Sequence, residues 1–159
     1  MPGLPSILRI SFYAVGLVVI TVVIHAVGFD ALLRALIRSR VLTTSGFGHA
    51  IRFVIGLACR LILIHLLEIF VWGLFYFWRG CLPNFQDAVY FSGATYTTAG
   101  YGDLVLPKAW RILAPLEALT GILMCGISAA LFFAVVSRRI SKEMQRKTAL
   151  EHQSAANEQ

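Results

Sequence analysis

The sequence predicts an all-α membrane protein in which three helices span the bilayer and a shorter helix enters and leaves it on one side. Of the 159 residues, 58% are hydrophobic and only 14% are charged, whereas a soluble domain carries about 25% charged residues. Three apolar runs are each long enough to cross a bilayer, which takes about 20 residues. This composition excludes an ordinary soluble domain.

The first apolar run extends from about Ile10 to Gly28. A secretory signal peptide is the alternative to a transmembrane helix. The run is longer than the usual apolar core of a signal peptide, and no A-x-A-like cleavage site follows it. We therefore expect a retained helix that spans the membrane.

Residues 29–40, FDALLRALIRSR, form an amphipathic pattern. Leucines and isoleucines recur at helical spacing, while Arg34 and Arg38 suit an anionic lipid surface. Asp30 is a candidate N-cap. The pattern predicts a short helix on the cytoplasmic face; the alternative is that the first helix simply continues out of the bilayer. The stretch TTSGFG at 43–48 then breaks the chain.

Two further apolar runs extend from about Arg52 to Trp78 and from about Trp110 to Val136. The first of these ends in aromatic residues typical of a membrane interface: Trp72, Phe75, Tyr76, Phe77 and Trp78. No run carries Arg at every third position, so the sequence shows no voltage sensor of the usual kind.

The positions of Lys and Arg predict the orientation. They concentrate between the first and second runs and again after the third: Arg34, Arg38, Arg40, Arg52, then Arg138, Arg139, Lys142, Arg146 and Lys147. By the positive-inside rule, the 29–52 segment and the C-terminus are cytoplasmic and the N-terminus lies outside. We expect a multi-pass protein of the plasma (cell inner) membrane. The net charge of +6 sits at span ends, so nucleic acid is not an expected partner.

The segment between the second and third runs is the most informative. Asn84 can cap a helix, and Asp87 three residues later completes a reciprocal cap. The helix that follows is too short to span, which indicates a re-entrant segment. It leads into TTAGYGD at 97–103, where alternating glycines let successive carbonyls face one way. Such non-helical backbone needs to be buried in protein or to line a water-filled path.

The stretch at 97–103 resembles the T-T-V-G-Y-G-D pattern of the potassium channel superfamily, in its form with two helices and a pore loop. The resemblance covers about residues 50–138: outer helix, pore helix, extended selectivity filter and inner helix. It implies that carbonyls of four filter residues line stacked potassium sites: Thr98, Ala99, Gly100 and Tyr101. The Thr98 hydroxyl closes the innermost site. The Tyr101 ring turns from the axis and packs against the pore helix. Three further residues form the mouth and its support: Thr97, Gly102 and Asp103.

One chain carries one such loop and a closed filter needs four, so a homotetrameric pore is expected. The implied function is passive conduction of potassium ions, with no catalysis, no cofactor and membrane lipid as the surrounding partner. Three segments follow: residues 1–49 as an N-terminal transmembrane helix with an amphipathic cytoplasmic helix, 50–138 as the pore domain and 139–159 as a short cytoplasmic tail. The tail end, TALEHQSAANEQ, is polar and expected to fray or to be disordered.

Two departures from the family pattern affect selectivity and support. Ala99 stands where Val is usual, which keeps a non-selective cation channel open as an alternative. Ala94 stands where some members have a Glu that braces the filter through Asp103. We hypothesise that Glu117, on the third run, supplies a substitute carboxylate behind the filter.

Ionisable residues inside spans are functional candidates by default. Arg60 is expected to snorkel toward the interface. His65 and Glu68 lie one turn apart and are expected to hydrogen-bond as a structural pair rather than a pH sensor, with Glu117 as a candidate third member. His25 is expected to be a satisfied buried histidine.

Alternatives from other classes remain. His25 and His65 could be axial ligands of a haem, or the chain could be a non-conducting accessory subunit. Three cysteines without metal-ligand spacing are interpreted as small buried hydrophobes: Cys59, Cys81 and Cys125.

The inner helix is expected to hold the gate. Gly121 is a candidate hinge and Gly126 a second, the alternative being close helix packing. Further residues recur at helical spacing and would line the cavity or close it by dewetting: Ile122, Cys125, Ala129, Phe132 and Phe133. Pro115, near the start of this helix, is expected to kink or reset it.

Overall fold

The computed structural model describes residues 4–38 and 47–157. They form four helices and, within those ranges, no strand: α1 (Leu4–Arg38), α2 (Phe47–Trp78), α3 (Phe85–Tyr96) and α4 (Leu113–Asn157). By length and composition, α1, α2 and α4 can each cross a membrane. The predicted all-helical architecture with three candidate spans is therefore confirmed.

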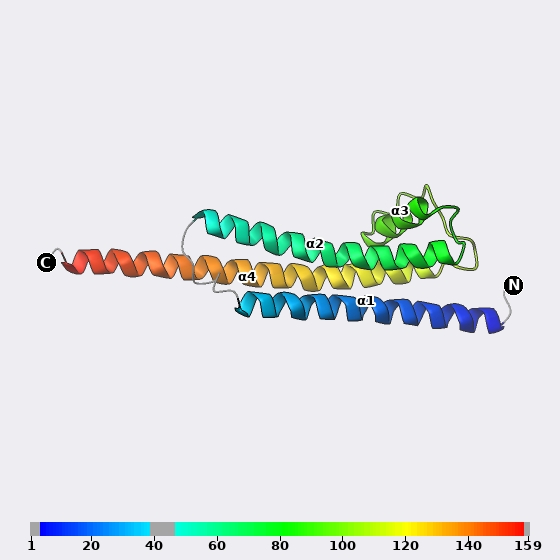
Figure 1. Cartoon of the computed structure of the whole chain (residues 1–159), viewed down its shortest axis with the longest axis horizontal. Helices are drawn as coiled ribbons and strands as arrows, with labels where there is room; N and C mark the ends of the chain where they lie inside the picture. Colours follow the sequence, from blue (N-terminus) through cyan, green and yellow to red (C-terminus); the bar gives the residue numbers. More distant parts are fainter. Residues whose placement is uncertain (1–3, 39–46, 158–159) are drawn as a thin grey trace.

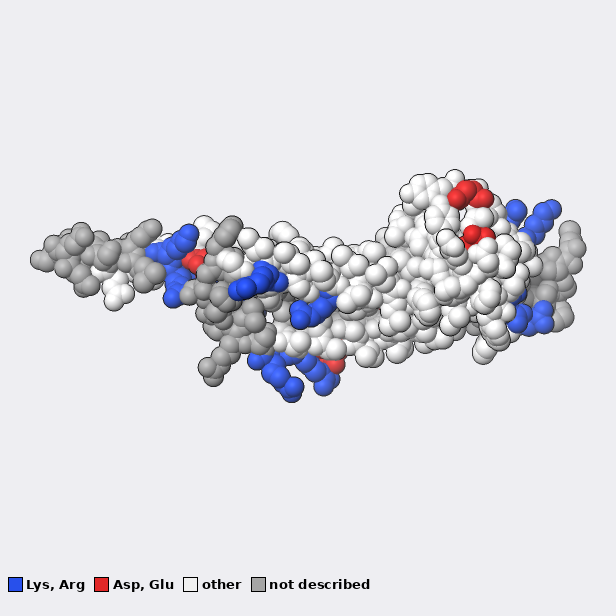
Figure 2. Space-filling view, turned by 45° about the horizontal axis from the view of Figure 1, so that its top comes forward, with Lys and Arg blue, Asp and Glu red and all other residues white. Residues whose placement is uncertain are grey.

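The three long helices run lengthwise beside one another, and α3 packs on α2 and α4 at the end of the bundle that holds the N-terminus (Figure 1). The C-terminus lies at the opposite end. On the face shown in Figure 2, Lys and Arg gather toward the two ends and leave an uncharged band between them. A slab of hydrocarbon around this band would meet few charges.

α1 is a single helix that continues to Arg38. The separate surface helix predicted for residues 29–40 is therefore wrong, and so is an N-cap at Asp30; the continued first helix is confirmed as far as Arg38. Asp30 lies inside α1 and pairs with Arg34 one turn later at 2.8 Å. Gly28 does not end the helix. It packs against α2, where a Cβ at this position would lie 2.8 Å from Ile64. Residues 39–46 lie outside the described ranges.

α4 is longer than the third apolar run. It continues to Asn157, so the expected disorder of the tail is wrong for residues 148–157. This stretch is rich in strong helix formers and contains neither Pro nor Gly, so nothing in it stops a helix. Pro115 is the third residue of α4, where its missing N–H would have no intrahelical partner. It therefore resets the start of the helix without a kink.

The short helix α3 begins as predicted. Asn84 Oδ1 accepts from the Asp87 N–H at 2.8 Å, and Asn84 Nδ2 donates to Asp87 Oδ2 at 2.9 Å. The reciprocal cap is confirmed, with the side-chain amide of Asn84 as the second donor. This cap fixes where the helix starts.

The aromatic residues of α2 have two roles. Trp72 and Tyr76 are fully buried, and the indole of Trp72 donates to Thr21 of α1 at 2.8 Å. These two side chains therefore pack inside the bundle, and their level at the membrane interface stays a prediction. At the end of α2 the Arg79 guanidinium lies 5.0 Å from the ring of Tyr13 and 5.4 Å from the ring of Trp78. These contacts fasten α1 to the loop end of the bundle.

Candidate functional site

The chain turns back on the last carbonyls of α3 before it enters the glycine segment. The Thr97 N–H donates to the Gly93 carbonyl at 3.1 Å, and the Gly100 N–H donates to the Ala94 carbonyl at 3.1 Å. These bonds hold residues 97–103 at the C-terminal end of α3, where the helix dipole leaves partial negative charge.

Backbone conformation alternates along this segment. The φ angle is 62° at Thr98, 51° at Gly100 and 79° at Gly102. Glycine adopts such angles freely, whereas Thr98 is the one non-glycine residue with positive φ among those described. A left-handed residue of this kind costs on the order of 1–2 kcal/mol. The pattern is not that of a β-strand, and it places the strain at the predicted innermost ion site.

Residues 97–103 are exposed in the single chain, which leaves their backbone uncovered. The resemblance implied that Tyr101 packs against the pore helix. Tyr101 is 74% exposed in the single chain. Its packing against a pore helix of the assembled filter stays a prediction.

A tyrosine supports the mouth of this segment. The Tyr90 hydroxyl of α3 donates to Asp103 Oδ2 at 2.8 Å, and this hydrogen bond raises the pKa of Tyr90 above its ordinary value. The sequence analysis missed this residue. The sequence did hold one signal. A phenylalanine would pack equally well at this position on the short helix, so the hydroxyl of Tyr90 indicates a hydrogen bond.

Glu117 is fully buried behind the pore helix. It accepts from the Tyr76 hydroxyl of α2 at 2.7 Å and from the Ser92 hydroxyl of α3 at 2.5 Å. The carboxylate therefore braces α3, two positions before Ala94, and does not bond Asp103. The hypothesis that Glu117 supplies a substitute carboxylate behind the filter stays a prediction, and Ser92 of the pore helix is the contact through which it would act.

A second polar cluster joins all four helices below the filter. Glu68 of α2, fully buried, accepts from His25 of α1 at 2.9 Å and from the hydroxyl of Tyr96, the last residue of α3. His65 lies 3.0 Å from that same hydroxyl through Nδ1 and 3.0 Å from the Ser128 hydroxyl of α4 through Nε2. We call these five residues the polar node.

The polar node corrects several expectations. His65 and Glu68 do lie together, at 3.4 Å, but Tyr96 and not Glu117 is their third member. His25 has a partner for Nδ1 only, because its Nε2 is buried without one. The sequence could not show that α1 and α3 reach this point.

The node also bears on the haem alternative. The rings of His25 and His65 lie 5.4 Å apart between centroids, and His65 is bonded on both nitrogens. They do not stand on opposite faces of a macrocycle. These two histidines and Glu68 have ligand atoms within 4.8 Å of one another, a spacing that could hold a metal ion. Hydrogen bonds already occupy His25 Nδ1, both nitrogens of His65 and both oxygens of Glu68.

Gly121 packs directly beneath the pore helix. A Cβ on Gly121 would lie 2.1 Å from the Tyr96 carbonyl oxygen. This contact favours the close-packing alternative over a hinge. At Gly126 a Cβ would meet nothing within 4 Å.

The remaining gate candidates divide between two faces of α4. Most are exposed in the single chain: Ile122, Cys125, Gly126, Ala129 and Phe133. Phe132 is half-buried and packs against a cluster between α1 and α2, so it does not belong to this exposed face. Of the three cysteines only Cys81 is buried. The prediction is wrong for Cys59 and Cys125, because a spanning helix turns apolar residues outward as well as inward.

Comparisons with known proteins agree with this arrangement. Residues 64–138 match a family model described as ion channel. No curated protein and no solved structure matches the chain. The matched segment contains the second half of α2, the whole of α3, the glycine segment and the first part of α4. Residues 64–138 therefore resemble an ion-channel family whose model describes a two-helix pore domain of the potassium-channel-like type.

Proposed function

We propose that this chain forms a homotetrameric, potassium-selective channel that lets ions pass down their gradient through residues 97–103. The observation that carries the proposal is the exposed backbone at the C-terminal end of α3, with positive φ at Thr98, Gly100 and Gly102. Strained, uncovered backbone is costly unless other contacts or ligands compensate for it.

The chemistry of the segment favours a cation. Residues 97–102 offer carbonyl and hydroxyl oxygens and no ionised side chain, and rings of such oxygens can replace the hydration shell of a monovalent ion. The α3 C-terminus adds partial negative charge nearby. Asp103, held by Tyr90, would concentrate cations at the mouth.

The surface that a single chain leaves uncovered supports an assembly of four copies. Only 17–22% of the most apolar window of each candidate span is buried within the chain. Lipid can cover apolar side chains, but it does not tolerate the exposed non-helical backbone of residues 97–103. Closed symmetry around that backbone would place it on a water-filled axis.

Ala99 supports a second candidate, a non-selective cation channel. A smaller side chain behind the filter braces it less than Val would. The two candidates share the fold and the pathway and differ only in the ratio of potassium to sodium flux.

Flux from reconstituted liposomes tests the proposal. We expect potassium efflux well above sodium efflux and block by barium. In Gly102→Ala the new Cβ would meet no other atom, but the φ angle of 79° is unfavourable for alanine. This substitution should therefore lower flux by backbone strain alone. Gly16→Ala, in an open helical position of α1 outside the pore domain, is the matched control. Equal potassium and sodium flux would favour the non-selective candidate, and absence of flux under all gradients would overturn conduction.

We also propose that the protein lies in the plasma (cell inner) membrane with the C-terminus in the cytoplasm. The N-terminus and residues 97–103 lie at one end of the bundle and the C-terminus at the other (Figure 1). Reporter fusions at each terminus, one active only inside the cell and one only outside, would test this. A C-terminal fusion active only outside would overturn it.

A further inference from the structure

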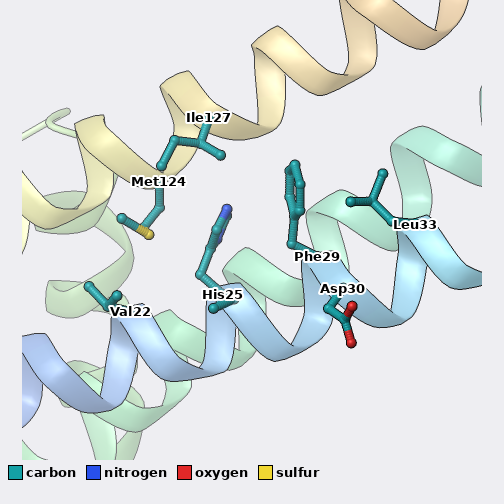
Figure 3. A pocket seen from close by; sticks show the side chains of 8 residues that line it. Val22, His25, Phe29, Asp30, Leu33, Met124 and Ile127 are labelled. Atoms are coloured by element: carbon teal, nitrogen blue, oxygen red, sulfur yellow. The ribbon is translucent and has the colours of Figure 1, made fainter.

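A groove lies between α1 and α4, outside the proposed conduction path. It has a volume of about 290 Å³. In Figure 3, Met124 and Ile127 of α4 point toward α1, and the rings of His25 and Phe29 point back toward α4. The walls are almost entirely apolar. This cavity lies within the candidate membrane spans of both helices.

The dimensions of the groove suit a lipid chain. Along α1 it extends from Val22 to Leu33, which at 1.5 Å per residue is about 16 Å. One leaflet of the hydrocarbon core is about 15 Å thick, half of the whole. The groove is therefore about as long as one leaflet is deep.

Positive charge marks one end of the groove. Asp30, whose carboxylate points away from α4 in Figure 3, pairs with the exposed Arg34 just beyond the groove wall. Arg38 follows one turn later, and Arg52 of α2 is also exposed. Within the described residues of α1, Asp30 is the only acidic side chain. The surface at this end keeps a net positive charge.

We propose that the groove binds one acyl chain of an anionic phospholipid, whose phosphate lies against Arg34 and Arg38. Basic sites between transmembrane helices on the cytoplasmic side recognise anionic headgroups. The apolar walls thus match the acyl chain of the phospholipid, and the adjacent arginines match its phosphate. The boundary between the two parts lies near Leu33.

A second copy of this chain fits the groove less well. Every copy carries the same arginines at the same depth, so packing copies on this face would bring cations together. Anionic lipid is attracted to this charge, whereas another copy is repelled by it. The occupant would touch His25 of the polar node and Met124 of α4, and so its presence would influence the spacing of α1 and α4.

Lipid retention provides the test. Protein in nanodiscs of phosphatidylcholine with a minority of phosphatidylglycerol would be examined by native mass spectrometry, with a diazirine in the middle of the phosphatidylglycerol acyl chain for crosslinking. We expect crosslinks on residues 22–33 and 124–127. Each arginine near a membrane surface contributes about fivefold in affinity, so Arg34→Gln with Arg38→Gln should weaken retention by about thirtyfold.

Two further variants make the test specific. Arg9→Gln removes an exposed arginine at the other end of α1 and should leave retention unchanged. Ala26→Phe, at an exposed position on the groove wall, should lower crosslinking without loss of fold. Crosslinks that map outside the groove, equal retention of both lipids, or a double arginine variant that behaves like Arg9→Gln would overturn the proposal. Because no ion flux is measured, the result is independent of channel activity.

Discussion

Replacing Gly121 with alanine tests whether α4 supports the filter through direct backbone contact. In a helix interior this substitution alone stabilises by about 1 kcal/mol. Here, however, the new Cβ would lie 2.1 Å from the Tyr96 carbonyl oxygen, whereas ordinary contact begins at 3.4 Å. The two backbones must therefore separate by about 1.3 Å.

The separation would reach the filter because Tyr96 is the last residue of α3 and Thr98 follows two positions later. Overpacking of this kind costs about 1–3 kcal/mol, which exceeds the gain in helix propensity. We expect Gly121→Ala to lower both the melting temperature in detergent and the potassium flux. For a chain of this size each kcal/mol corresponds to roughly 2–4 °C.

Gly16→Ala is the matched control, inside α1 and outside the pore domain, where a Cβ meets nothing within 4 Å. It should melt at or slightly above the wild-type temperature and keep its flux. If Gly121→Ala behaved like Gly16→Ala in both assays, the claim that α4 holds the pore helix by this contact would be wrong.

Three other substitutions test the hydrogen bonds around the filter. Glu117→Ala should destabilise the protein by about 1–3 kcal/mol because it leaves the buried Tyr76 hydroxyl without its acceptor. Glu117→Gln keeps the shape and a hydrogen-bond acceptor and should cost less, so equal melting temperatures for the two variants would contradict this role. Tyr90→Phe removes the bond to Asp103 and should cost about 1 kcal/mol while it speeds the decay of flux under sustained gradients; an unchanged time course would contradict it. Tyr96→Phe removes the hydroxyl that joins α3 to the polar node. It should lower the melting temperature by several degrees, at roughly 2–4 °C per kcal/mol. An unchanged melting temperature would show that the node does not hold α3.

Features that depend on neighbouring residues were predictable. The capped start of α3 follows from Asn84 and Asp87, three positions apart, because both bonds form within one turn. The positive φ angles at Gly100 and Gly102 follow from the freedom of glycine. The three candidate spans follow from length and hydropathy alone.

Contacts between distant segments were not predictable. Tyr90 was not singled out from the sequence, yet it bonds Asp103, 13 residues later. For Gly121 the sequence leaves a hinge and close helix packing open, and the approach of Tyr96 favours packing. In both cases one residue type serves several purposes, and only the neighbour across the fold distinguishes them.

By itself, the sequence determined that this is a membrane protein with a glycine segment after a short capped helix, because hydropathy and local backbone preference are properties of short stretches. Only the tertiary structure decided what stands behind that segment. It joined His25, Glu68 and Tyr96 from three helices into one node and placed Glu117 against Ser92. Buried polar side chains need partners, and which partners they find depends on how the helices pack.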